Sequence, residues 1–165
     1  FLTGDAGYLK GHHLYLTERI KDLFKTSNGK YIAPQQIETL LTSDMFFEQV
    51  AVIGDQRNYV TAIVVPNLVA LRKYAEENNI AYDNDDALIA DERIYKFLEA
   101  RIAKHQENMA HFEHIKKFTL IKKGFTIEAG ELTNTLKLRR AIISQKYAAQ
   151  IDAMYDLGPQ TFVVK

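Results

Sequence analysis

Two apolar runs rich in β-branched residues constrain the fold of this chain more than any other feature. Residues 49–54 and 59–65 are separated by the short polar segment 55–58, a pattern that predicts two antiparallel strands joined by a turn. Because the runs are almost continuously apolar, both faces of the strand pair are expected to be buried. The pair therefore belongs at the centre of the domain, with other elements packed on each side.

Helical patterns and one further strand surround this pair. Helices are predicted over residues 68–78, 91–109 and 138–155, another helix begins at Pro34, and a strand covers residues 118–122. The 91–109 helix is expected to start at an aspartate N-cap. The side chains expected to face inward from the last two helices are Ile94, Phe97, Leu98, Ile102, Ile142, Ile143, Tyr147, Ile151 and Met154. No regular βαβ repeat is visible, so the fold class is α+β, with a small central, mostly antiparallel sheet flanked by helices.

Two short hairpins are predicted before the central pair. Residues 8–9 and 14–16 flank a turn that contains Gly11. Residues 23–26 and 31–32 flank the dipeptide Asn28-Gly29, which favours tight turns because both residues tolerate positive φ.

Composition excludes several classes of function. The chain has 21 basic and 21 acidic side chains and no cysteine. A formal charge of zero argues against nucleic-acid binding by the whole chain, and the lack of cysteine excludes disulfides, thiolate metal sites and a cysteine nucleophile. No apolar run approaches the length of a membrane span, which is about 18 residues. The histidines are interpreted as solvated side chains rather than metal ligands; they are His12, His13, His105, His111 and His114.

Charge is unevenly spread along the chain. Residues 76–95 carry seven acids and one base, whereas residues 10–30 carry five bases and two acids. Residues 111–140 carry seven bases and three acids. The two basic segments either converge into a patch suited to a phosphorylated ligand or form separate solvated surfaces.

Three segments contain residues suited to chemistry. Asp5 follows Thr3-Gly4, and a carboxylate on such a turn can accept hydrogen bonds from a ribose diol or simply complete the turn. Residues 19–38 form a polar strap whose freed backbone amides suit an extended, amide-containing ligand, or else a charged linker. Residues 130–140 place threonines and Lys137 on a loop before a helix, where a lone lysine is by itself an ordinary solvated side chain.

In this order and spacing the three segments resemble the acyl-adenylate-forming enzymes, the superfamily of acyl- and aryl-CoA synthetases, adenylation domains and luciferases. The sequence is most similar to AMP-forming long-chain fatty-acid–CoA ligases in three motifs, which are IKDLFKT over residues 20–26, GKYIAP over 29–34 and ELTNTLK over 131–137. The resemblance runs from Thr3 to about Tyr155 and covers the C-terminal portion of such an enzyme.

The resemblance implies a domain organisation and a reaction. Residues 1–20 would be the tail end of an N-terminal adenylation domain, ending in the first hairpin, and residues 21–165 a mobile C-terminal domain with an acidic helical insertion at about 68–110. The whole enzyme would use ATP and CoA as substrates to convert a fatty acid to acyl-CoA, AMP and diphosphate. Mg²⁺ would accompany ATP there and would not be bound by this chain. With no phosphate-binding loop and no acyl pocket, the chain alone is expected to be inactive.

Roles follow for the residues that match the family motifs. Lys137 would be catalytic, reaching the α-phosphate and the acyl carboxylate during adenylation. Asp5 would bind the ribose hydroxyls, Arg19 would lie beside the nucleotide, and Lys21 would be the hinge. The residues expected to face CoA are Ser27, Asn28, Gly29 and Lys30. The chain departs from many relatives at Asn28 and at Leu136, where they carry glycine, and at Asn134, where they carry proline.

The implied partners are the enzyme's own N-terminal domain, ATP or AMP, CoA and a fatty acid, with no nucleic acid. The implied location is cytoplasmic, with peripheral membrane contact through the parent enzyme. The alternatives are a medium-chain or aryl-CoA ligase, another adenylate-forming enzyme, or a non-catalytic module that binds nucleotide or CoA.

Overall fold

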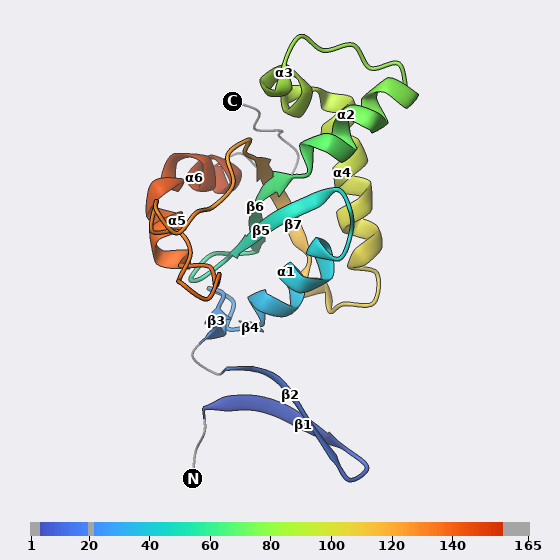
Figure 1. Ribbon diagram of the computed structural model, residues 1–165. Coiled ribbons are helices and arrows are strands. Elements are labelled where there is room, and N and C mark those ends of the chain that lie inside the picture. The colour runs from blue at the N-terminus through green and yellow to red at the C-terminus, as the bar shows by residue number, and fades with distance from the viewer. Residues whose placement is uncertain (1–3, 20–21, 157–165) are drawn as a thin grey trace.

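The computed structural model describes residues 4–19 and 22–156, and Figure 1 shows how their elements are arranged. The described strands, in chain order, are β1 (Asp5–Lys10), β2 (His13–Arg19), β3 (Phe24–Lys25), β4 (Tyr31–Ile32), β5 (Phe47–Ile53), β6 (Val60–Pro66) and β7 (Ile115–Leu120). The described helices are α1 (Pro34–Thr42), α2 (Leu68–Glu77), α3 (Asp85–Ala90), α4 (Glu92–His105), the 3₁₀ turn η2 (His111–Glu113), α5 (Arg140–Lys146) and α6 (Ala148–Asp156).

A three-stranded sheet in the order β5-β6-β7 lies at the centre of the fold. β5 and β6 pair antiparallel, with Val52 opposite Ala62, and every residue of β6 is buried. The predicted central strand pair, buried on both faces, is therefore confirmed. β7 pairs parallel to β6, because α2, α3 and α4 carry the chain back to the end of the sheet at which β6 begins.

Helices cover both faces of this sheet. Val50 and Val52 of β5 pack into a core with side chains of α1, α2 and α4, whereas Ala51 and Ile53 pack into a second core with α5 and α6. The alternation follows from the two-residue period of a strand. Figure 1 shows α5 and α6 on one side of the sheet and α1, α2 and α4 on the other. The predicted α+β fold, in which helices flank a small central sheet, is confirmed, and this sheet has one antiparallel and one parallel strand pairing.

Both predicted hairpins are present. β1 and β2 pair antiparallel, and Gly11 in their turn has φ of +64°. β3 and β4 pair antiparallel, and Gly29 in the connecting turn has φ of +78°.

The structure differs from the sequence-based expectation in several elements. β7 covers residues 115–120, where a strand was predicted over 118–122, and α4 ends at His105, where the helix was predicted to reach residue 109. The predicted last helix is two helices, α5 and α6, because the chain turns at Tyr147. α3 was not predicted from the sequence; Asn84 is its N-cap and accepts a hydrogen bond from the Ala87 amide. In α4, Tyr95 is buried and its ring stacks on that of Phe118 at 4.2 Å between centroids, while Phe97 is half-buried. Within the described residues, no helix is both long and apolar enough to cross a membrane.

Candidate functional site

Lys137 lies at the end of a tightly closed loop, residues 131–139, which is called the lysine loop below. The backbone carbonyl of Glu131 accepts from the Arg139 amide at 2.8 Å, and Leu132 and Leu138 form an antiparallel bridge. The Thr133 amide donates to the Lys137 carbonyl at 2.8 Å, and the Lys137 amide donates to Thr133 Oγ1 at 3.1 Å. The backbone of Lys137 is therefore held in a fixed position by its own loop.

The side chain of Lys137 is exposed. Among the described residues, its ammonium makes no ion pair or hydrogen bond. It lines an open cavity of about 360 Å³ whose wall also includes Glu38 and Thr39 of α1, Glu48 of β5 and Arg140. A cation that is exposed but carried on an ordered loop is suited to contact an anionic group presented from outside the domain.

Leu136, directly before this lysine, has φ of +60° and an exposed side chain. The left-handed region is unfavourable for a residue with a Cβ atom. Its occupation here explains physically why glycine would suit this position.

Residues 27–30, which are predicted from the sequence to face CoA, form the turn between β3 and β4; the turn is called the CoA turn below after that prediction. The Gly29 amide donates to the Thr26 carbonyl at 2.9 Å, and the Ser27 amide donates to the Arg57 carbonyl at 3.0 Å. Side chains add two more links, from Ser27 Oγ to Asn58 Oδ1 at 2.8 Å and from Asn28 Nδ2 to the Asn58 carbonyl at 3.0 Å. The turn is therefore fastened to the β5–β6 turn.

The prediction of freed backbone amides in this strap is wrong for three of its residues. The amides of Ser27 and Gly29 are bonded to carbonyl groups, and the Lys30 amide donates to Thr26 Oγ1 at 3.2 Å. The amides of Gly29 and Lys30 close the hairpin itself, and the amide of Ser27 joins it to the β5–β6 turn. What the turn offers to a ligand is its exposed side chains, including Lys30, whose ammonium lies 5.4 Å from the centroid of the Phe112 ring. Sequence reasoning missed Phe112, because η2 carries no periodic pattern.

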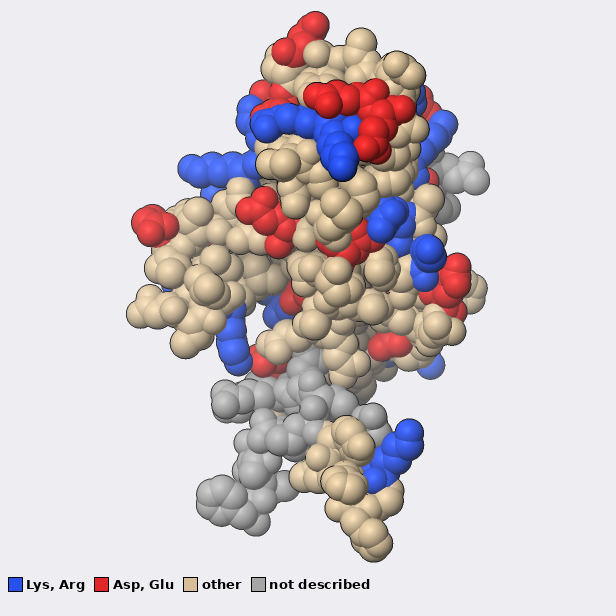
Figure 2. All heavy atoms as spheres, turned by 45° about the vertical axis from the view of Figure 1, so that its right-hand side comes forward, with Lys and Arg blue, Asp and Glu red and all other residues tan. Residues whose placement is uncertain are grey.

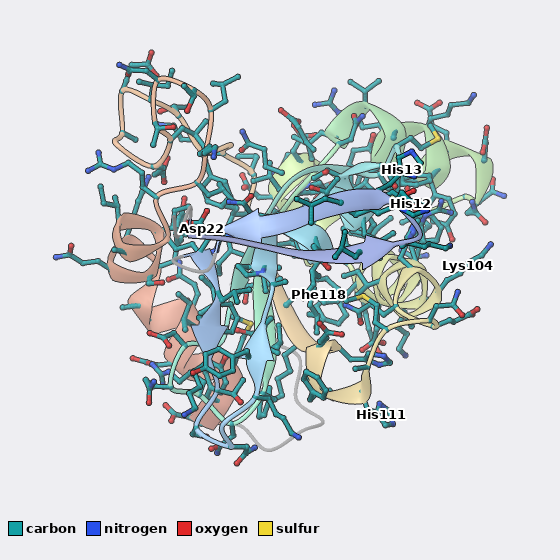
Figure 3. All side chains as sticks on the ribbon, turned by 90° about the horizontal axis from the view of Figure 1, so that it is seen from below. His12, His13, Asp22, Lys104, His111 and Phe118 are labelled. Carbon is teal, nitrogen blue, oxygen red and sulfur yellow. The ribbon has the colours of Figure 1, made fainter. Side chains whose placement is uncertain are left out.

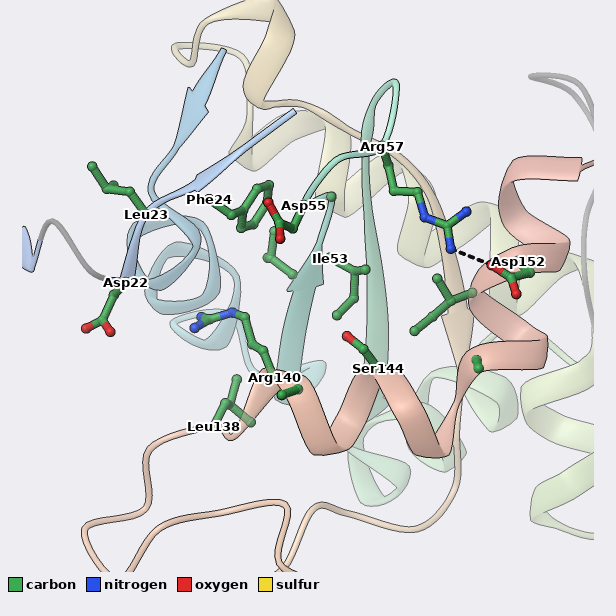
Figure 4. Close-up of a pocket in the computed structure, with 15 residues that line it drawn as sticks. Asp22, Leu23, Phe24, Ile53, Asp55, Arg57, Leu138, Arg140, Ser144 and Asp152 are labelled. Atoms are coloured by element: carbon green, nitrogen blue, oxygen red, sulfur yellow. Dashed lines mark hydrogen bonds and ion pairs between the residues drawn. The ribbon is translucent and has the colours of Figure 1, made fainter. Parts of the chain in front are cut away.

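A second, larger cavity of about 640 Å³ lies between β3, the end of β5 and the helices α5 and α6. Figure 4 shows Arg140 reaching into it from the start of α5 and Phe24 approaching from β3, with Arg57 and Asp152 joined at its other end. Arg57 pairs with Asp152 at 2.5 Å, and Arg140 Nη2 pairs with Glu38 Oε2 at 2.5 Å. Arg140, from the second basic segment, lines both cavities, whereas no described base of residues 10–30 lines either of them. The charges of Arg57 and Arg140 are already balanced by Asp152 and Glu38.

The structure places the remaining predicted residues as follows. Asp5 and Arg19 are opposite each other in the β1–β2 register, so their backbones lie together at the open end of the hairpin. Lys21 lies outside the described residues. Lys137 lines the cavity beside α1 and β5, whereas the CoA turn is bonded to the β5–β6 turn, so the two predicted contact regions occupy different parts of the domain.

The histidines do not gather at one site, although the ring centroids of His111 and His114 lie 5.0 Å apart. Figure 3 shows His12 and His13 at the tip of the β1–β2 hairpin and His111 well away from them. In the described part of the chain, no group of three or more His, Cys, Asp or Glu side chains is placed to hold a metal ion. The expectation of solvated histidines is wrong for His105 and His114. Both are half-buried, with His105 Nε2 2.8 Å from Asp44 Oδ2 and His114 Nε2 3.2 Å from the Met109 carbonyl.

The acidic stretch is largely neutralised by neighbouring bases. Arg72 of α2 donates two hydrogen bonds to Asp85, at 3.0 and 2.7 Å. This hydrogen bonding is the largest cause that holds the pKa of Asp85 below its ordinary value. Lys122 pairs with Asp86 at 2.5 Å. Figure 2 shows acidic and basic atoms interleaved over the upper part of the molecule. This region therefore presents mixed charge, not an acidic patch.

Comparison with known proteins gives concordant matches. The chain is 29% identical over 158 residues to the long-chain-fatty-acid–CoA ligase FadD15 of Mycobacterium tuberculosis, covering 94% of this chain and 26% of that protein. It is 34% identical over 157 residues to the peroxisomal long chain acyl-CoA synthetase 7 of Arabidopsis thaliana, covering 93% of this chain and 22% of that protein. The structure matches the adenylation domain of a carboxylate reductase from Mycobacterium chelonae with a TM-score of 0.74 and 26% identity, over 94% of this chain and 23% of that one.

The chain thus spans about a quarter of the length of these relatives. The family model described as "AMP-binding enzyme C-terminal domain" matches residues 21–158, which include both the CoA turn and the lysine loop. The chain belongs to the family of AMP-binding enzyme C-terminal domains.

Proposed function

We propose that residues 21–165 are the mobile C-terminal domain of an ATP-dependent long-chain fatty-acid–CoA ligase, and that residues 1–20 end its N-terminal domain. The observation that carries this proposal is Lys137, an exposed ammonium on an ordered loop inside the region that matches the family. The names of the long-chain ligases that match over most of this chain support the choice of substrate.

In this proposal Lys137 acts in the first half-reaction. A carboxylate oxygen of the fatty acid attacks the α-phosphorus of ATP, a bond forms between them, and diphosphate leaves with the electrons of the broken P–O bond. Negative charge accumulates around the α-phosphate in the transition state, and a cation held there stabilises it. The hydrogen bonds that fix the lysine loop limit the entropy lost when the ammonium is brought to that position.

Replacing this cation tests the assignment. In the full-length enzyme, Lys137→Ala is expected to lower the rate of acyl-adenylate formation by ~10²–10³-fold and to spare thioester formation from preformed acyl-adenylate. Diphosphate release and acyl-CoA formation measure the two steps. Lys123→Ala, at another exposed lysine, is the matched control and should change neither. An equal loss in both half-reactions would refute the role given to Lys137.

The second half-reaction would use the CoA turn after the domain rotates. Lys21 would be the hinge, Asp5 would bind the ribose hydroxyls, and Arg19 would lie beside the nucleotide. The separation of the CoA turn from the lysine loop supports this division of labour, since one orientation cannot present both equally to a single active site. Lys21→Pro is expected to block thioester formation and leave adenylation intact, because proline fixes φ. Loss of adenylation in that variant would count against a hinge.

The other parts of the proposal concern the surroundings of the domain. Its partners would be the N-terminal domain, ATP or AMP, CoA and a fatty acid, in a cytoplasmic enzyme with peripheral membrane contact. Mg²⁺ would enter with ATP as part of the substrate, and the described residues offer no cluster that fits it.

A second candidate is another adenylate-forming enzyme, which the likeness to a carboxylate reductase adenylation domain favours. The two differ in the acceptor of the acyl group. CoA-dependent release of AMP from the acyl-adenylate supports the ligase, and adenylation without CoA-dependent turnover supports the alternative. A medium-chain or aryl-CoA ligase would differ in acyl preference, and a binding module would form no adenylate at all.

A further inference from the structure

Glu131 is a buried carboxylate at the base of the lysine loop. Its side chain is 1% exposed. Oε1 accepts from Lys146 Nζ at 2.7 Å and lies 3.4 Å from the Tyr147 hydroxyl, and Oε2 accepts from the Thr126 amide at 3.1 Å. One side chain therefore links the segment before the lysine loop to the end of α5.

The backbone of the same residue belongs to the stem that carries Lys137. The Glu131 carbonyl accepts from Arg139, and its amide donates to the Thr126 carbonyl at 3.1 Å. From there the Leu132–Leu138 bridge and the paired Thr133 and Lys137 continue to the end of the loop. Any shift of Glu131 relative to α5 is thus transmitted through a short, hydrogen-bonded ladder to Lys137.

A buried carboxylate is costly unless charged and polar partners compensate it. The partners of Glu131 compensate its burial. The hydrogen bond to Glu131 is also the largest cause that raises the pKa of Lys146 above its ordinary value. Because the carboxylate has partners on two sides, it can occupy only one position without losing one of them. That requirement fixes the start of the lysine loop, at Glu131, against the end of α5.

We propose that Glu131 is a positioning residue for Lys137, setting where the ammonium stands when the acyl-adenylate forms. The proposal rests on the proposed function, because it needs Lys137 to act in adenylation. Glu131 itself touches neither substrate.

The decisive variant is Glu131→Gln in the full-length enzyme, which keeps the shape and removes the charge. Misplacement of a catalytic group by about 1 Å costs on the order of 10- to 100-fold in rate, and a loss of this size is expected in adenylation. Thioester formation from preformed acyl-adenylate should stay within about twofold of the wild type, since it does not use Lys137.

Asp44→Asn is the matched control for loss of a buried charge. Asp44 is also 1% exposed and ion-paired, with Arg101 and His105, but it makes no contact with the lysine loop. This variant should lower the melting temperature without changing the ratio of the two half-reaction rates. If it changes that ratio as much as Glu131→Gln does, general destabilisation explains both and the proposal is overturned.

A double-mutant cycle separates this proposal from the proposed function. Once Lys137 is alanine, Glu131→Gln should have no further effect on adenylation, because a positioning residue acts only through the group it positions. Additive losses would overturn the proposal and leave Lys137 in its role. An unaffected adenylation rate in Lys137→Ala alone would instead overturn the proposed function. If Glu131→Gln does not yield folded protein, Lys146→Ala removes the exposed partner and should give the same selective loss.

Discussion

Asp44 carries a charge in a nearly closed site between the end of α1 and α4. Its Oδ2 accepts from Arg101 Nε at 2.7 Å and lies 2.8 Å from His105 Nε2, and its Oδ1 accepts from the Phe46 amide at 3.0 Å. Arg101 in turn covers the Phe46 ring at 4.7 Å from its centroid. A carboxylate with so many donors favours its ionised form.

The stability of the domain should therefore depend on pH through Asp44. Burial acts to raise the pKa of Asp44, but the hydrogen bonds from Arg101, Phe46 and His105 outweigh it and hold the pKa below the ordinary 3.8. A lowered folded-state pKa stabilises the fold above the unfolded-state pKa of about 4, and this stabilisation is lost as pH falls through that value towards the folded-state pKa.

Asp44→Asn should lower the free energy of unfolding by about 3 kcal/mol at pH 7, and the deficit should shrink below pH 4. Urea denaturation at a series of pH values measures this difference. Asp85→Asn, which removes an exposed pair with Arg72, should change stability little at any pH. A pH-independent deficit for Asp44→Asn would contradict the assignment.

Leu136 gives a second prediction for a single residue. Its φ of +60° and exposed side chain mean that Leu136→Gly relieves backbone strain and loses little packing. We expect the free energy of unfolding to rise by ~0.5–1 kcal/mol, since the relief of about 1–2 kcal/mol is partly offset by the greater freedom of glycine in the unfolded chain. Chemical denaturation measures it, with Leu138→Gly, at a half-buried position without positive φ, as a control that should destabilise.

At the scale of single residues, sequence reasoning identified positions but not partners. Lys137 and the turn with Gly29 could be found because a sequence motif and the residues that favour a turn are recognised from a few neighbouring residues. The roles of Asp44 and Glu38 could not, because their partners Arg101 and Arg140 are 57 and 102 residues away along the chain. Only the folded chain brings these charges together.

Among the elements, α4 shows how a local signal fixes a helix. Asp91 accepts from the Arg93 amide at 2.8 Å as the N-cap and also binds the Arg93 guanidinium through both carboxylate oxygens. The hydrogen bonds from the Arg93 side chain are the largest cause that lowers the pKa of Asp91. The predicted N-cap is thus confirmed.

Two substitutions separate the cap from the ion pair. Asp91→Ala should cost about 1 kcal/mol of stability, because it leaves amide groups of the first turn without an acceptor. Arg93→Ala keeps the cap and removes only an exposed cation, so its effect should be clearly smaller. Thermal unfolding of the two variants compares them, and equal losses would mean that the ion pair, not the cap, stabilises the helix start.

Elements defined by long-range packing were harder to predict than those defined by local pattern. β5, β6 and α4 follow from apolar runs and periodicity. The break between α5 and α6 did not, because buried Ile143, Tyr147 and Ile151 continue one apolar face across it. The parallel orientation of β7 is likewise set by how α2 to α4 cross the sheet face, which no pattern within residues 115–120 encodes.

For the whole molecule, the proposal predicts that these 165 residues fold but show no ligase turnover, since the phosphate-binding loop and the acyl pocket would belong to the rest of the enzyme. Incubation of the chain with ATP, CoA, Mg²⁺ and a long-chain fatty acid should release no diphosphate above background, whereas the full-length enzyme should. Circular dichroism checks that the inactive chain is folded. Turnover by the folded chain alone would contradict the proposed division of the enzyme.

The parallel pairing of β6 with β7 also has a kinetic consequence. The central strand finds β5 through the short turn at residues 54–59, but it meets β7 only after the whole segment 67–114 has been synthesised and folded back. Closing so long a loop has an entropic cost that must be met before the new contacts form. During synthesis β6 would therefore leave one edge open until β7 emerges from the ribosome. That interval is when the nascent chain is most exposed to mispairing, and chaperone binding would matter most then.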